Sequence, residues 1–305
     1  MAADTTASNY WLNWRFFLCA LWISAAVLIS GLIIWKYERR RRNVSKTEPE
    51  LLLRGQSWGT SFKSVHPLCL LAYRLLAFCC LLALLTADIV EHSFHILYFY
   101  TEWTLTLAVI YFGLGSAASL YGCLFFGRKD DSDVEENSHG ENGGNPEMGS
   151  MLEHIVEEPD MKCRHAPNWE YALQILLQMV AGAVALTDTV FWLVLYPFFS
   201  SKDYALHFLA ASVHSFNAIF LLGDIILNSL HFPFFRIAYF ILWTSAFVVF
   251  QWLVHAFVKL RWPYPFLDLS SPNAPIWYLA VGVLHIPCYG IFWIMFKIKK
   301  CCLSR

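Results

Sequence analysis

The 305-residue sequence is too apolar and too weakly charged for a soluble globular protein. It is 57% hydrophobic and only 15% charged, whereas about 25% of the residues of an average soluble protein are charged. Lys and Arg number 22 against 23 Asp and Glu, and this near balance argues against nucleic acid or another polyanion as a partner. The composition predicts an integral membrane protein whose surroundings are mainly membrane lipids.

Seven segments are long and apolar enough to cross a bilayer as helices. A hydrocarbon core about 30 Å thick requires about 20 mainly apolar helical residues. In chain order the predicted spans are 16–35, 68–89, 97–126, 171–198, 206–227, 237–258 and 276–296. We therefore expect an all-α fold, a polytopic membrane bundle of about seven transmembrane helices.

Basic residues predict how these spans are oriented. The first span ends in Lys36 and a run of four arginines at 39–42 and has no small-residue cleavage site, which is typical of a retained anchor rather than a signal peptide. If the N-terminus is extracytosolic, 17 Lys and Arg outside the spans face the cytosol and 4 face the other side. Because cytosolic loops are enriched in Lys and Arg, we expect the N-terminus outside and the C-terminus in the cytosol.

One polar stretch divides the chain into two membrane parts. Residues 1–127 contain three spans and a basic cytosolic segment at 36–66. Residues 128–168 combine acidic side chains with a run rich in Gly and Asn, a composition that predicts a disordered cytosolic loop. Residues 169–305 contain the other four spans and a basic cytosolic tail.

Cysteines and short motifs indicate neither a disulfide framework nor a cofactor. The nine cysteines are odd in number and lie mostly in apolar stretches, where they behave as small hydrophobic residues. The sequence has no Gly-x-Ser-x-Gly elbow, no His-Glu-x-x-His zinc motif and no phosphate-binding loop. The single pair His92 and His95 supplies too few ligands for a di-iron site. We therefore expect no metal and no cofactor.

Titratable side chains inside the spans are the candidate functional residues. A charged Asp or Arg at the centre of a bilayer costs about 2.5 to 3.5 kcal/mol on insertion scales. With a rise of about 1.5 Å per residue, three of them lie about 12 to 15 Å below the outer ends of their spans, namely Asp188, His214 and His285. Nearer the same surface are Thr101, Glu102 and His255. The sequence thus predicts a polar pocket that opens toward the outer leaflet.

Each of these residues also has a simpler interpretation as a hydrogen-bonding contact between helices, which contributes about 0.6 kcal/mol on average. For two others this structural interpretation is preferred. Asp224 lies near the cytosolic end of the fifth span, away from the pocket. Arg74 in the second span is expected to hold helices together or to contact a lipid phosphate.

Three passages of the sequence resemble a known family. They are Tyr100-Thr101-Glu102-Trp103 with Ile110-Tyr111-Phe112-Gly113, then Val213-His214-Ser215-Phe216-Asn217, and finally Tyr239-Phe240-Ile241-Leu242-Trp243 with Trp262-Pro263-Tyr264-Pro265-Phe266-Leu267. On these passages the chain resembles, from Phe99 to about residue 296, the androgen-induced protein family of multipass lipid hydrolases. Rolling-stone-related proteins and plant transmembrane relatives share the likeness.

The resemblance implies an activity and two catalytic residues. Characterised members of that family cleave esters of fatty acids with hydroxy fatty acids, with an intramembrane threonine as nucleophile and a histidine as its base. By motif, Thr101 would be the nucleophile and His214 the base, since a threonine hydroxyl is a poor nucleophile until a base removes its proton. Asp188 or His285 would orient the imidazole, which is an inference from these residues and not part of the family's pattern.

The sequence departs from the family in two respects. Ser212 and Ser215 flank His214 where the family typically has an Asn–His pair and a threonine. The first span, the basic segment and the acidic loop are additional. The resemblance, despite these departures, predicts a hydrolase of fatty-acyl esters in the endoplasmic reticulum or plasma membrane.

Two other functions remain open from the sequence. One is a non-enzymatic membrane protein that binds a lipid or a partner in the same pocket. The other is a transporter, which requires broken helices in paired halves, and only Pro287 suggests a break. The sequence does not indicate an oligomeric state.

Overall fold

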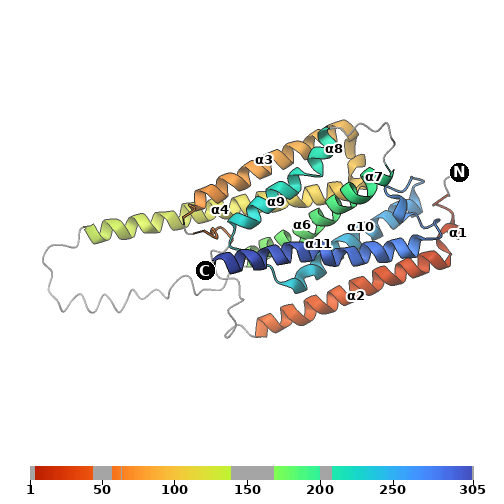
Figure 1. Ribbon diagram of the computed structural model, residues 1–305, viewed down its shortest axis with the longest axis horizontal. Coiled ribbons are helices and arrows are strands. Elements are labelled where there is room, and N and C mark those ends of the chain that lie inside the picture. The colour runs from red at the N-terminus through yellow and green to blue at the C-terminus, as the bar shows by residue number, and fades with distance from the viewer. Residues whose placement is uncertain (1–3, 44–56, 63, 139–167, 200–207, 304–305) are drawn as a thin grey trace.

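The computed structural model describes residues 4–43, 57–62, 64–138, 168–199 and 208–303. In this part of the chain the regular structure is helical, with one isolated bridge between Thr60 and Asn228. Seven of the helical segments are long and apolar enough to cross a membrane. Figure 1 shows them side by side in one elongated bundle. The all-α fold with seven membrane spans is therefore confirmed, and the chain is a multipass membrane protein.

The helices follow the predicted spans closely. The first span is α2 (Trp14–Asn43), preceded by the short α1 (Ser8–Trp11). Next come α3 (Pro67–His92), the 3₁₀ helix η1 (Ser93–Tyr98) and α4 (Tyr100–Ser138). The fourth span is α6 (Asn168–Val190), η3 (Phe191–Leu195) and α7 (Tyr196–Phe199), and the fifth is α8 (Phe208–Val213) and α9 (Phe216–Leu227). After η4 (Phe234–Arg236) follow α10 (Ile237–Phe257), η5 (Pro265–Leu267) and α11 (Ala274–Leu303).

Two of the spans are not continuous α-helices, which the sequence did not indicate. The fourth span contains a π-helical segment, η3, between α6 and α7. The fifth span breaks at His214 and Ser215, where the Ser215 N–H bonds the Ser212 carbonyl at 3.2 Å instead of continuing the α pattern. In contrast, α11 runs without interruption through Pro287. Pro287, the one residue in the sequence that suggested a break, therefore does not interrupt its span, and proline is tolerated inside membrane helices.

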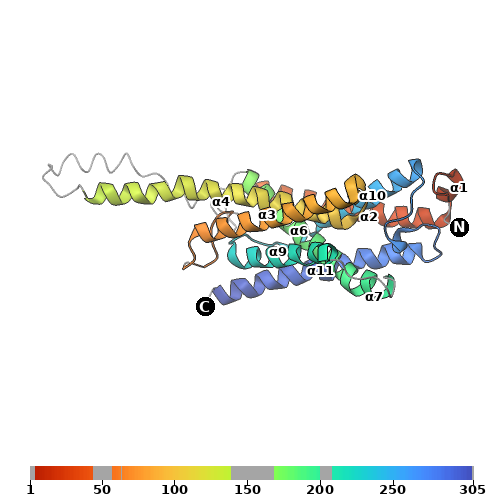
Figure 2. The same cartoon turned by 90° about the horizontal axis from the view of Figure 1, so that it is seen from above.

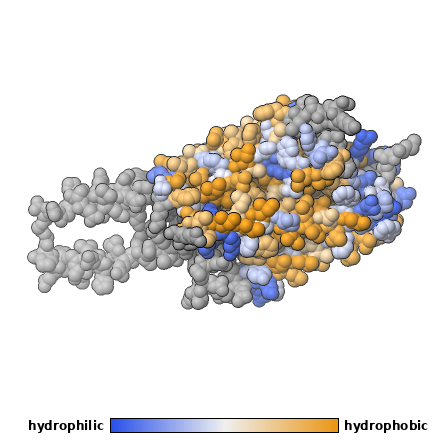
Figure 3. All heavy atoms as spheres, in the orientation of Figure 1, coloured by the Kyte–Doolittle hydropathy of each residue, from blue (hydrophilic) through white to orange (hydrophobic). Residues whose placement is uncertain are grey.

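Apolar side chains cover the outside of the bundle, as a lipid environment requires. Along the first span, Leu21, Leu28 and Leu32 are each about three-fifths exposed or more. Figure 3 shows apolar residues over the middle of the molecule and hydrophilic ones toward its ends. α4 projects past the other helices at one end (Figures 1 and 2) and continues through residues 128–138, the first part of the predicted loop. Residues 139–167 lie outside the described residues, and the orientation of the termini stays a prediction.

A buried ion pair joins α3 to α9 at the end of the bundle where α3 begins and α9 finishes. Arg74 Nε lies 2.7 Å from Asp224 Oδ1, and both side chains are 0% exposed. Arg74 Nη1 also donates to the Ser57 carbonyl at 2.7 Å and to Ser119 Oγ at 2.9 Å. The Tyr111 hydroxyl donates to the second oxygen of Asp224. The structural interpretation of both residues is confirmed, and a lipid-phosphate contact for Arg74 is wrong because no part of its side chain reaches the surface.

One close helix contact lies where Gly182 of α6 meets the Phe240 ring of α10, since a Cβ at Gly182 would overlap that ring. We expect Gly182→Ala to lower the free energy of unfolding by about 1 to 3 kcal/mol through overpacking. Gly31→Ala in α2 is the matched control, because Gly31 has open space around it and alanine is the better helix former. Denaturation in mixed micelles measures both variants, and an equal effect of the two would contradict the close packing.

Candidate functional site

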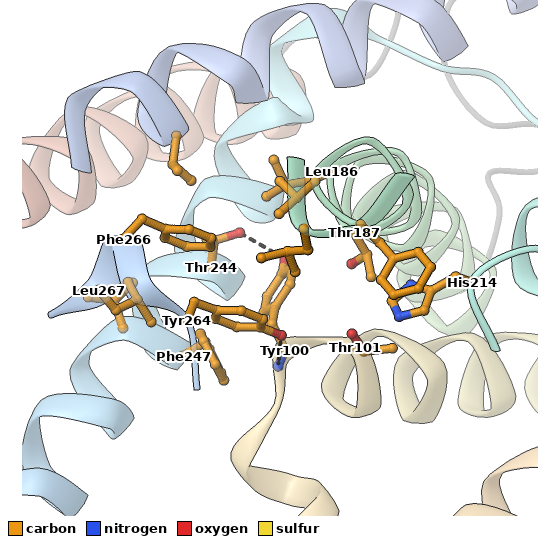
Figure 4. A pocket seen from close by; sticks show the side chains of 15 residues that line it. Tyr100, Thr101, Leu186, Thr187, His214, Thr244, Phe247, Tyr264, Phe266 and Leu267 are labelled. Atoms are coloured by element: carbon orange, nitrogen blue, oxygen red, sulfur yellow. Dashed lines mark hydrogen bonds between the residues drawn. The ribbon is translucent and has the colours of Figure 1, made fainter. Parts of the chain in front are cut away.

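A cavity lies inside the bundle near the end where α4 begins and α10 finishes (Figure 4). Its empty volume is about 500 Å³, open solvent included. Apolar side chains make most of its wall, among them Leu186, Val190, Leu195, Phe247 and Val248. The polar residues on the wall are one histidine, three threonines and two tyrosines, namely His214, Thr101, Thr187, Thr244, Tyr100 and Tyr264.

Thr101 reaches the cavity from the first turn of α4, which begins at Tyr100. Tyr264, from the loop between α10 and α11, lies against this helix end, and its hydroxyl accepts the Tyr100 N–H at 3.0 Å. Burial raises the pKa of the Tyr264 phenol to about 12. The Thr101 hydroxyl lies close enough to interact with the phenol oxygen. The nucleophile candidate is therefore anchored at a helix N-terminus, where the helix dipole favours negative charge.

His214 lies at the break between α8 and α9, and the π segment of the fourth span holds it. Its ring stacks on the Phe191 ring with centroids 3.6 Å apart and planes 5° apart. Its carbonyl accepts the Trp192 indole N–H at 3.1 Å. π segments and interrupted helices occur in membrane proteins where the backbone lines a cavity or a functional site. His214 and Thr101, from different spans, thus line the same cavity (Figure 4).

Asp188 is the predicted pocket residue that lies next to His214. The separation between Asp188 Oδ1 and His214 Nδ1 is 3.8 Å, which is too long for a direct hydrogen bond but short enough for one bridging water. Neither carboxylate oxygen of Asp188 has a hydrogen-bond partner among the described residues, and His214 Nδ1 has none either. Asp188 therefore lies on the Nδ1 side of the imidazole.

Asn217 belongs to the same polar group, although the sequence offered no reason to choose it. It lies on α9 just after the break, is 1% exposed, and its Nδ2 lacks a partner among the described residues. Its side chain lies near enough to Asp188 to stabilise that carboxylate. A buried amide in an apolar helix is the only signal that the sequence carries, and such a residue is often just a contact between helices.

His285 does not join this group. It is buried on α11, where Nδ1 interacts with the Val281 carbonyl at 2.8 Å and the ring lies 4.4 Å from that of Phe240. It is absent from the cavity wall, to which Val281 contributes instead. Of the three residues expected in one layer, Asp188 and His214 therefore meet and His285 faces elsewhere. The expected depth ignored the direction in which each side chain leaves its helix.

His255 belongs to an aromatic cluster at the C-terminal end of α10. Its Nε2 lies 2.7 Å from the Tyr98 hydroxyl, its Nδ1 lies 2.7 Å from the Gln251 carbonyl, and its ring stacks on Trp262 at 3.8 Å. Both ring nitrogens are thus engaged in structural contacts. His255 does not line the cavity.

Glu102 turns away from the cavity toward α3. Its side chain is buried and lies within hydrogen-bonding reach of Asp88, which itself interacts with His92 at 3.0 Å. Glu102 follows Thr101 in sequence, and consecutive residues of a helix point about 100° apart. It therefore belongs to the contact between α3 and α4.

The cavity wall also carries hydroxyl groups that sequence reasoning missed. Thr187 Oγ1 lies 3.0 Å from Thr104 Oγ1, and the Tyr100 hydroxyl lies 2.9 Å from Thr244 Oγ1. These groups come from spans three, four and six, so no local pattern in the sequence could have grouped them. These hydroxyls bond one another and so link the three spans at the cavity wall.

The site combines one imidazole, a carboxylate beside it, a nearby hydroxyl and apolar walls, which suits a ligand with a carbonyl group and a long apolar part. Among the described residues no group of three or more His, Cys, Asp and Glu is arranged to hold a metal ion. The chain matches no model of a known protein family, no curated protein and no solved structure.

Proposed function

We propose that this multipass membrane protein hydrolyses fatty-acyl esters within the bilayer, with Thr101 as the nucleophile and His214 as its base. The observation that carries the proposal is that both side chains line one mostly apolar cavity between the spans. Their spans are separate in the chain, so the fold brings a hydroxyl and an imidazole to a common space. The resemblance of residues 99–296 to the androgen-induced protein family agrees with this assignment.

The chemistry divides hydrolysis into two steps. The His214 imidazole takes the hydroxyl proton of Thr101 while Oγ1 bonds to the ester carbonyl carbon. It then returns the proton to the departing alcohol, which leaves the acyl group on Thr101. Water then attacks the acyl carbon while His214 takes its proton, the bond from that carbon to Thr101 Oγ1 breaks, and His214 returns the proton to Oγ1 as the fatty acid is released. Nε2 is the nitrogen that serves Thr101, because Nδ1 faces Asp188.

Asp188 supports this chemistry as a positioning residue. A carboxylate beside the distal nitrogen holds the imidazole in the productive tautomer and stabilises the imidazolium when it forms. The 3.8 Å between Asp188 and His214 is long for that role, but catalytic hydrogen bonds often tighten only when substrate is bound.

A second candidate function is lipid binding without chemistry. The apolar wall would hold an acyl chain equally well if no ester were cleaved. The hydroxyls of Thr187 and Thr244 already have partners, which favours a stable binding site over a reactive one. Both functions require lipid in this cavity, and only the first requires covalent chemistry at Thr101.

Covalent trapping separates the two functions. Purified protein in lipid nanodiscs is assayed with 4-methylumbelliferyl oleate and then treated with an alkyl fluorophosphonate, which loses fluoride as its phosphorus bonds to an activated hydroxyl. We expect ester hydrolysis above the uncatalysed rate, loss of that activity on treatment, and the adduct on the peptide that contains Thr101. An uncatalysed rate, or an adduct only at another residue, would leave lipid binding as the function.

A further inference from the structure

Tyr264 is the one cavity residue that reaches the start of α4 from outside the membrane spans. It lies in the turn Trp262-Pro263-Tyr264-Pro265, between α10 and η5. Its hydroxyl accepts the Tyr100 N–H at 3.0 Å and interacts with the Thr101 side chain. In Figure 4 the Thr101 hydroxyl lies between the Tyr264 phenol on one side and the His214 ring on the other. The nucleophile candidate thus has a base and a phenol on opposite sides.

Aromatic contacts hold the Tyr264 ring in place. It stacks on Phe266 with centroids 5.1 Å apart and planes 2° apart. Phe99 and Phe247 contact it at 6.3 and 6.4 Å between centroids. The residue is 8% exposed. A donor that is already held in place needs no reorganisation during the reaction. This preorganisation is what makes electrostatic stabilisation of a transition state effective.

The phenol retains its proton and can donate it in a hydrogen bond. Its oxygen accepts a backbone N–H from the start of α4, so its O–H is not used in that contact. The pKa of Tyr264, raised to about 12 by burial, keeps the group neutral at physiological pH. A neutral phenol and the positive end of a helix dipole together favour negative charge at this point.

We propose that the Tyr264 hydroxyl is the oxyanion donor of the site, acting on the carbonyl oxygen of the ester that Thr101 attacks. This inference rests on the proposed hydrolase function. As Oγ1 of Thr101 bonds to the carbonyl carbon, the π electrons of the carbonyl move to its oxygen and His214 takes the threonine proton. Tyr264 donates a hydrogen bond to that oxygen and transfers no proton. When the carbonyl re-forms, the alcohol leaves with the proton held by His214.

The test compares Tyr264→Phe with Tyr98→Phe in nanodiscs, with 4-methylumbelliferyl oleate as substrate. Both changes remove one phenol hydroxyl, but Tyr98 is half-buried, bonds His255 and does not line the cavity. We expect Tyr264→Phe to lower kcat by about 100- to 1,000-fold with little change in KM, as for loss of an oxyanion donor. The rate of fluorophosphonate labelling at Thr101 falls in parallel. Tyr98→Phe keeps kcat within about threefold of the wild type, since its hydroxyl contacts His255 and the Arg261 carbonyl outside the cavity.

A second replacement keeps the test valid if Tyr264→Phe does not fold. With 3,5-difluorotyrosine at position 264, the ring shape is kept and the phenol becomes more acidic. If the neutral phenol is the donor, the alkaline limb of the kcat profile moves to lower pH, because the donor is lost when the phenol ionises. A tyrosine that only supports the fold would leave this limb in place.

The outcomes distinguish this inference from the function on which it rests. Normal kcat in Tyr264→Phe, or an unmoved alkaline limb in the fluorinated protein, overturns the role of Tyr264 while hydrolysis by the wild type stands. Absence of hydrolysis in the wild type overturns both. If Tyr264→Phe raises KM without lowering kcat, Tyr264 binds the substrate and does not stabilise the oxyanion, which also contradicts the proposal.

Discussion

Thr101→Ala is expected to lower kcat for ester hydrolysis by about 10⁴-fold or more, to the level that the remaining cavity supports without a nucleophile. Thr101→Ser keeps a hydroxyl in the same first turn of α4 and is expected to retain part of the activity. His214→Ala is expected to cost about 10² to 10⁴-fold, the usual contribution of a general base. Steady-state hydrolysis of 4-methylumbelliferyl oleate by each purified variant gives these values.

Two matched variants control for the effects of substitution itself. Thr86→Ala removes a threonine from the exposed face of α3, where the hydroxyl bonds only the Leu82 carbonyl. His92→Asn changes a histidine whose side chain is 57% exposed. Both are expected to retain the wild-type kcat. The mechanism is refuted if Thr101→Ala hydrolyses the ester as fast as Thr86→Ala. The double variant of Thr101 and His214 should have a kcat no lower than that of the slower single variant, because the effects of substituting residues of one catalytic unit do not add.

The membrane architecture was predictable because the bilayer imposes it. A span needs about 20 apolar residues in any fold, so a local count of side chains finds each one. The residues at which the helices end were harder to predict. The third predicted span stops at residue 126, whereas α4 continues to Ser138, since a helix that leaves the membrane has no reason to end at the lipid boundary.

The site was predictable only in part, because depth along a helix does not give direction around it. His214, His285 and Asp188 have similar expected depths, yet only His214 and Asp188 meet. His255 was expected near the pocket and instead stacks on Trp262. The direction of a side chain depends on how the spans rotate against one another, and that is decided by packing across the whole bundle.

Interruptions of the spans were the feature hardest to foresee. Proline is the usual signal of a broken helix, but α11 passes through Pro287 and the fifth span breaks at His214 and Ser215. The break coincides with the stack of His214 on Phe191 in the π segment. Two distant segments thus stabilise each other's irregular backbone, and a contact of that kind leaves no local pattern in the sequence.

Arg74→Ala is expected to lower the free energy of unfolding by about 3 to 5 kcal/mol, the largest loss of stability that we expect from one substitution in this chain. Without the guanidinium, the Asp224 carboxylate stays buried between α3, α4 and α9, and its remaining side-chain donors among the described residues are the Tyr111 hydroxyl and the Asn228 amide. Unfolding in mixed micelles, followed by circular dichroism, measures the loss. Replacing Lys259, whose exposed pair with Asp4 contributes little, is the control and should leave stability nearly unchanged.

The double replacement Arg74→Met with Asp224→Leu separates two effects on the free energy of unfolding. One is the cost of leaving a buried charge unpaired, and the other is the net contribution of the ion pair. Removing both charges leaves no unpaired group of either sign, so the double variant is expected to be more stable than Arg74→Ala, as is usual when a buried pair is replaced by apolar residues. Some loss remains because the Ser57 carbonyl and the Ser119 hydroxyl each lose a donor. If instead the two single losses simply add in the double variant, Arg74 and Asp224 act independently, and a direct ion pair does not hold this end of the bundle.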